Sequence, residues 1–220
     1  MAKKNICGYT LGEEIFSSVS HGVGALLGIA ALVLLIIFAA INGDALDVVG
    51  VCIYGASLIV LYTISTLYHS LTNETAKKVF KVLDHCSIYL LIAGTFTPMC
   101  FSVMRSLGWK SVLLITLIWL AAILGIVLYA CFPKKLKILH IILYVSMGWS
   151  VLFLMKDLIA TLKLAQAIST LYFLLAGGIA YTAGVIFYVF KKVKYFHSVF
   201  HLFVLAGSIC HFFSVLFYFV

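Results

Sequence analysis

Charged residues are scarce in this sequence, and that scarcity decides the class of protein before any motif is considered. Asp, Glu, Lys and Arg make up 10% of the 220 residues, whereas hydrophobic residues make up 65%. A soluble globular domain carries about 25% charged residues. The composition therefore excludes a soluble globular protein and indicates an integral membrane protein with several spans. Because the length suits one compact bundle, we expect a single domain over residues 1–220.

The sequence also lacks closely spaced pairs of cysteines. Six cysteines are present, none of them in C-x-x-C spacing, and most fall inside apolar runs: Cys7, Cys52, Cys86, Cys100, Cys131 and Cys210. Cysteines in such runs behave as small apolar core residues. A disulfide framework is therefore not expected.

The few charged residues divide the sequence into seven apolar runs. Each run is close to the roughly 20 residues that an α-helix needs to cross the hydrocarbon core of a membrane. The predicted spans are residues 22–41, 48–71, 83–104, 110–131, 138–155, 167–190 and 197–219. A short helix along the cytoplasmic surface is expected before them, at about residues 9–21. The predicted fold is an all-α integral membrane protein, a seven-transmembrane helix bundle.

Basic residues are unevenly divided between the two ends of this bundle. Eleven of the fifteen lie in the N-terminal tail and in the loops after the second, fourth and sixth spans, and the other four are Arg105, Lys110, Lys156 and Lys163. Since Lys and Arg collect on the cytoplasmic side, we expect the N-terminus in the cytoplasm and the C-terminus outside. The net charge of +8 then reflects this topology and attraction to anionic lipid. Short, separated basic loops do not favour a nucleic-acid partner.

The last span begins with two histidines four residues apart, His197 and His201. In a helix, residues i and i+4 lie one above the other on one face, with their β-carbons about 5–6 Å apart. Two imidazoles held in this way can bind one divalent metal ion. The alternative is a pair of interfacial histidines at the membrane boundary, and the spacing alone does not separate the two interpretations.

Other polar residues are predicted at the same depth. The second span ends in Ser65 and His69, and Asp84 is the only acidic residue within the apolar part of a span. A carboxylate in that position is costly unless it is paired or faces a polar cavity, so it marks a functional site by default. The alternative role for Asp84 is that of a helix N-cap. Before the first span, Glu14 and His21 share one helical face.

Together these residues predict a zinc site at the cytoplasmic end of the bundle. Three imidazoles with an open fourth position are the arrangement of a catalytic zinc ion, and His21, His69, His197 and His201 are all predicted at this level. Asp84 can then orient or deprotonate a water, and Ser65 can hydrogen-bond that water or a developing oxyanion. The residues expected beside this site are Glu14, His21 and His85. The metalloprotease motif His-Glu-x-x-His is absent, because Ser198 occupies the position of its Glu.

At these residues the chain resembles the haemolysin III family, the bacterial branch of the progestin and adipoQ receptor proteins, in a superfamily with alkaline ceramidases. The motifs that carry the resemblance are Ser65-x-x-x-His69, Asp84-His85, Gly94-Thr95-x-Thr97-Pro98 and His197-x-x-x-His201-Leu202, with Glu13-Glu14, Ser20-His21-Gly22 and Cys210-His211. The resemblance covers nearly the whole chain. It implies seven helices and a cytoplasm-side zinc held by His69, His197 and His201, with Ser65 and Asp84 nearby.

The resemblance also implies a location and a range of functions. Receptor members are linked to hydrolysis of the lipid amide ceramide. Bacterial members are named for cytolysis and are connected with membrane lipid homeostasis. A bacterial member is expected to be a multi-pass protein of the plasma membrane, the inner membrane where there are two.

Three functions follow as hypotheses. The first is a zinc-dependent, ceramidase-like hydrolase of a membrane lipid amide or ester, whose partners are membrane lipids. The second is a cytolytic pore with a structural zinc, although the spans lack the ring of charged residues that would line a wide aqueous path. The third is a sensor or receptor of lipid state. A transporter is disfavoured, because we find neither internal repeats nor ionisable residues at the membrane midplane.

Overall fold

The computed structural model describes residues 8–133, 135–190 and 193–220, and all regular elements within them are helical. The α-helices are α1 (Leu11–Asn42), α2 (Ala45–Ser70), α3 (Glu74–Pro98), α4 (Trp109–Cys131), α5 (Lys137–Gly148), α6 (Met155–Leu164), α7 (Ile168–Val189) and α8 (Phe196–Phe219). A π-helical turn at Met99–Val103 prolongs α3, and a 3₁₀ turn at Ser150–Leu154 joins α5 to α6.

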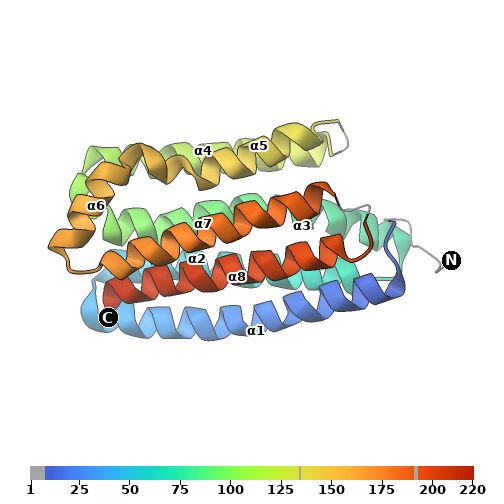
Figure 1. Ribbon diagram of the computed structural model, residues 1–220, viewed down its shortest axis with the longest axis horizontal. Helices are drawn as coiled ribbons and strands as arrows, with labels where there is room; N and C mark the ends of the chain where they lie inside the picture. Colours follow the sequence, from blue (N-terminus) through green and yellow to red (C-terminus); the bar gives the residue numbers. More distant parts are fainter. Residues whose placement is uncertain (1–7, 134, 191–192) are drawn as a thin grey trace.

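Seven segments of the described residues are long and apolar enough to cross a membrane. Five of them are the single helices α1, α2, α4, α7 and α8. The sixth is α3 with its π-helical turn, and the seventh is the continuous stretch Lys137–Leu164 that contains α5 and α6. The long helices run side by side, and the start of α1 and the end of α8 lie at opposite ends of the bundle (Figure 1). The predicted all-α fold with seven spans is confirmed.

Three boundaries differ from the sequence prediction. The expected surface helix at residues 9–21 is continuous with the first span, because Thr10 caps α1 in a capping box with Glu13 and no break follows. The third span begins at Glu74 instead of residue 83. The fifth continues beyond residue 155 to Leu164, since the 3₁₀ turn bends the helix without ending it.

Small residues let neighbouring helices approach closely. A Cβ atom placed on Gly24 of α1 would lie 2.6 Å from the ring of Tyr62 on α2. Likewise, a Cβ atom on Gly207 of α8 would lie 2.9 Å from the ring of Tyr181 on α7. The glycines therefore fix the pairs α1–α2 and α7–α8, and these pairs position the polar residues described below.

The end of the bundle that contains the α1–α2 loop is held by a charged cluster. Asp44 caps α2, and its carboxylate accepts hydrogen bonds from Arg105, whose Nη2 also bonds Asp47 at 2.8 Å. The Arg105 guanidinium and the backbone amides at the cap lower the pKa of Asp44 to about 2. The same cluster raises the pKa of Arg105. These groups tie the α1–α2 loop to the loop before α4.

Candidate metal centre

The three histidines predicted as ligands lie together at the opposite end of the bundle. His69 is on the last turn of α2, and His197 and His201 are on the first two turns of α8. One ring nitrogen from each lies within 4.8 Å of those of the other two, and the Nε2 atoms of His197 and His201 are 3.2 Å apart. All three are buried, with exposed fractions of 3%, 4% and 1%. The arrangement is a group that could hold a metal ion.

The start of α8 is fixed by contacts with α1. Tyr195, the residue before α8, has a positive φ of 65°, a backbone conformation that residues other than glycine rarely adopt. Its N–H donates to Oε1 of Glu13 at 2.9 Å. One turn further along, the hydroxyls of Ser17 and Ser198 are 3.1 Å apart. Glu13 and Ser17 therefore set where α8 begins and which face of it carries His197.

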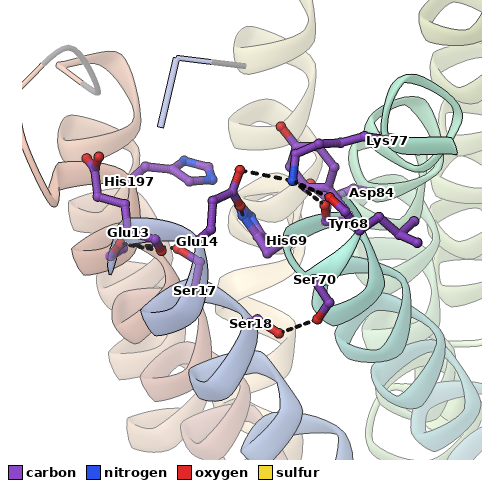
Figure 2. A network of polar contacts seen from close by, with 12 residues as sticks. Glu13, Glu14, Ser17, Ser18, Tyr68, His69, Ser70, Lys77, Asp84 and His197 are labelled. Atoms are coloured by element: carbon purple, nitrogen blue, oxygen red, sulfur yellow. Dashed lines mark hydrogen bonds and ion pairs between the residues drawn. The ribbon is translucent and has the colours of Figure 1, made fainter. Parts of the chain in front are cut away.

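His69 is held by a buried ionic network that joins three helices. Its Nδ1–H donates to Oε2 of Glu14 at 2.5 Å, and Oε1 of Glu14 lies 3.0 Å from Nζ of Lys77 on α3. Figure 2 shows the Glu14 carboxylate between the His69 imidazole and the Lys77 ammonium. Because Nδ1 carries the proton, Nε2 is the nitrogen of His69 that can bind a metal, and it has no hydrogen-bond partner among the described residues.

Two aromatic rings cover the other histidines. Tyr9 stacks on His197 with ring centroids 4.7 Å apart, and His21 stacks on His201 at 3.7 Å. His21 also meets the ring of Tyr62 edge-on. Within the described residues, neither ring nitrogen of His21 makes a hydrogen bond of good geometry. His21 thus lies against His201 and outside the three-histidine group.

Asp84 and Ser65 line a small cavity with the histidines. The cavity has a volume of about 30 Å³, room for one or two waters, and its wall includes His21, His197 and His201. Asp84 is not a helix cap, because α3 begins ten residues earlier with Asn73 as its N-cap. The alternative structural role for Asp84 is therefore wrong. Asp84 is instead one of the residues that line the cavity, and its Oδ2 lies 3.7 Å from Nδ1 of His85.

His85 turns toward α7 from its place beside Asp84. Its Nδ1–H donates to the carbonyl of Lys81 at 2.8 Å, and its Nε2 accepts from the hydroxyl of Tyr188 at 3.3 Å. The ring also stacks on Tyr129 of α4. With these contacts His85 lines the cavity and packs against α4 and α7, and it is not part of the three-histidine group.

A larger apolar cavity adjoins the small one. It has a volume of about 150 Å³ and is walled mainly by aliphatic and aromatic side chains of α3, α5, α7 and α8. Five residues line both cavities: Leu61, Ile88, Tyr188, Phe200 and Val204. A space suited to a hydrocarbon chain therefore meets a smaller space whose lining residues include Asp84, Ser65 and histidines.

Sequence reasoning missed three residues of this end of the bundle. From the sequence, Lys77 contributes only to the predicted orientation, Glu13 appears only within a motif, and no role is predicted for Tyr9. A signal for Lys77 was present, because it stands seven residues before Asp84 and so shares its helical face. The sequence offers no comparable signal for Tyr9 and Glu13, because their contacts are with residues at the start of α8, which is distant in the sequence.

The fold and this arrangement define a multi-pass membrane protein with a buried three-histidine group near a carboxylate. Comparison with known proteins supports this assignment to a class of membrane proteins. A family model described as "Haemolysin-III related" matches residues 9–212, and the chain belongs to this family. It is therefore a protein of the plasma membrane, as the sequence predicts.

Individual relatives cover most of the chain. A protein named "Hemolysin-3 homolog" from Bacillus subtilis is 43% identical over 210 residues, which is 96% of each chain. "Hemolysin-3" from Bacillus cereus is 43% identical over 207 residues, 94% of this chain and 91% of its own. The human "Monocyte to macrophage differentiation factor" is 26% identical over 183 residues, 80% of this chain and 72% of its own.

Proposed function

We propose that the protein is a zinc-dependent hydrolase of a membrane lipid amide or ester and contributes to membrane lipid homeostasis. The observation that carries the proposal is the junction of two cavities. One contains Asp84, Ser65 and two of the three clustered histidines, and the other is apolar and adjoins it. Reactive polar groups beside a hydrocarbon-sized space suit a substrate that has both a polar bond and an acyl chain.

The donor set fits zinc. His69, His197 and His201 would hold the ion, because three neutral imidazoles with an open fourth position are typical of catalytic zinc sites. The Glu14 carboxylate on His69 is the partner that such ligands usually have. When bound, a zinc ion supplies Lewis-acid chemistry: it polarises a carbonyl oxygen and makes water a stronger acid.

The remaining roles fall to two side chains of the small cavity. Asp84 is an acidic residue of its wall, so it is the base that would take the proton of an attacking water and return it to the leaving group. Ser65 is buried in the same wall and would donate its hydroxyl hydrogen to the oxygen on which negative charge develops. The acyl chain of the substrate would occupy the apolar cavity.

A cytolytic pore is the contrasting candidate, favoured by the printed names of the two Bacillus relatives. Against it, the larger cavity between the helices is apolar, and an apolar lumen of this size does not conduct ions. In that case the three histidines would have a structural role only.

Metal content tests the first part of the proposal. We expect about one zinc per purified chain, by elemental analysis, and a sharp fall in His201→Ala. His211→Gln is the matched control, because His211 packs against Gly177 of α7 and is outside the three-histidine group, although it lines the apolar cavity. Undiminished zinc in His201→Ala would exclude the three-histidine group as the metal site.

Lipid turnover tests the second part. Fatty-acid release from ceramide and from phospholipid in mixed micelles should fall about 100-fold or more in Asp84→Asn, with zinc retained. If neither lipid is hydrolysed by the zinc-loaded protein, and dye leaks from liposomes equally with wild type and Asp84→Asn, the pore is favoured instead.

A further inference from the structure

Lys77 is a buried lysine in the first turn of α3, with an exposed fraction of 3%. Lysine is almost never buried to this degree unless its charge is paired. Three oxygens surround its Nζ atom: Oε1 of Glu14 at 3.0 Å and the carbonyls of Tyr68 at 2.9 Å and Leu71 at 3.2 Å. An ammonium has three donors, so all of them are used.

Two of these partners fix the ammonium independently of Glu14. Tyr68 is in the last turn of α2, and Leu71 is the residue that follows the helix. Carbonyls at a helix C-terminus lack intrahelical partners and lie at the negative end of the helix dipole. Lys77 is therefore anchored on the end of α2, the same helix end that carries His69.

From this anchor Lys77 faces one oxygen of the Glu14 carboxylate, and the other oxygen faces His69. Figure 2 shows the side chain of Glu14, from α1, directed toward His69 and Lys77. With Oε1 on the ammonium, Oε2 lies 2.5 Å from Nδ1 of His69. Without Lys77 the carboxylate would lose the contact that fixes the orientation of its plane relative to the imidazole.

We propose that Lys77 is a positioning residue of the metal centre. It orients the Glu14 carboxylate, which in turn holds His69 in the tautomer that presents Nε2 to the metal. The proposal rests on metal binding by the three histidines and not on lipid hydrolysis, so failure of the lipid assay leaves it intact. Lys77 itself touches neither metal nor substrate.

Charge and position predict opposite effects for the loss of Lys77. If the lysine acted only as a nearby positive charge, its removal would strengthen the binding of a cation. If it orients Glu14, its removal weakens binding, because groups that hold metal ligands typically contribute 10- to 100-fold to metal affinity. As Lys77 is one step further from the metal than such groups, we expect the lower value, about tenfold.

The test is cobalt binding to the full-length apo-protein in detergent, measured by competition with a chelator and by the visible absorption of bound Co²⁺. The variants are Lys77→Met, Glu14→Gln and the double variant, with Lys78→Met as the matched control. Lys78 is exposed one residue along the same helix, so its variant loses the same charge without the contact.

We expect Lys77→Met to bind Co²⁺ about tenfold more weakly, with a changed visible spectrum, and Lys78→Met to match wild type. In the Glu14→Gln background the Lys77→Met effect should disappear, because the carboxylate through which it acts is gone. Tighter binding by Lys77→Met, or an equal loss in both backgrounds, would overturn the proposal; the second result would mean that Lys77 only supports the α2–α3 junction.

Folding is checked by the thermal unfolding of each apo-protein. If Lys77→Met does not fold, Lys77→Gln takes its place, because an amide can still donate to the α2 carbonyls without orienting Glu14 by charge. A wild-type protein that binds no cobalt would refute both this inference and the three-histidine metal site. Wild type that binds cobalt without hydrolysing lipid would refute the proposed function alone.

Discussion

Gly178→Leu is expected to shorten the acyl chain that the protein accepts. Gly178 is on α7 in the wall of the apolar cavity, and a Cβ atom there would lie 3.5 Å from the Trp149 ring, an ordinary contact. A side chain can therefore be added without moving α7. The adjacent Gly177 offers no such room, since its Cβ would collide with the ring of His211.

The size of the effect follows from the carbons that the leucine adds. Its four side-chain carbons occupy space that about four methylenes of a bound acyl chain would fill. Burial of one methylene contributes about 0.8 kcal/mol, so a long chain loses about 3 kcal/mol of binding. That corresponds to roughly 100-fold in apparent affinity. A short chain that ends before Gly178 loses little.

The assay is the release of fatty acid from a series of amides whose acyl chains differ only in length. KM should fall with chain length in wild type, because each buried methylene adds binding free energy, and should stop falling in Gly178→Leu once the chain is long enough to reach residue 178. Ala176→Leu is the matched control, because Ala176 is exposed on the lipid-facing side of α7. An equal loss at every chain length, or full activity on the longest chain, would show that the acyl chain does not lie in this cavity.

Two further predictions concern stability, measured by thermal unfolding in detergent micelles. Gly24→Ala should destabilise the protein by about 1–3 kcal/mol, because the added Cβ would lie 2.6 Å from the buried ring of Tyr62. The control Gly22→Ala should not destabilise it, because the added Cβ would have no neighbour closer than 3.8 Å. Arg105 holds the pKa of the Asp44 carboxyl at about 2, below the value of about 4 in an unfolded chain. Since the lowered pKa stabilises the fold above pH 4 and this stabilisation is lost as the pH falls through 2, Asp44→Asn should melt below wild type at pH 6, and the two should converge near pH 2. A difference that persists at pH 2 would contradict the ionic interpretation.

Local patterns made most of the fold predictable. Apolar runs of about 20 residues determine helices in a membrane, because each backbone N–H must bond within its own segment. The four-residue spacing of His197 and His201 puts both on one helical face for the same local reason. Span counting then placed His69 at the same level, and the structure brings the three together.

The role of Asp84 is an example of what local sequence patterns do not determine. From the sequence, Asp84 could be either a helix cap or a cavity residue. The position of the helix start, at Glu74, decided between them. That start depends on the cap residue Asn73 and on the burial of Lys77 under α2, and burial against another helix is not encoded in a segment's own periodicity.

The sequence by itself determined the class of protein, the seven spans and the shared depth of three histidines, because hydrophobicity, helix periodicity and loop charge are properties of single segments. Only the tertiary structure decided that Lys77 and Glu14 support His69, that His85 packs against α4 and α7, and that two cavities meet beside Asp84. These features depend on which side chains fill the gaps between helices. That choice is made when distant segments pack together.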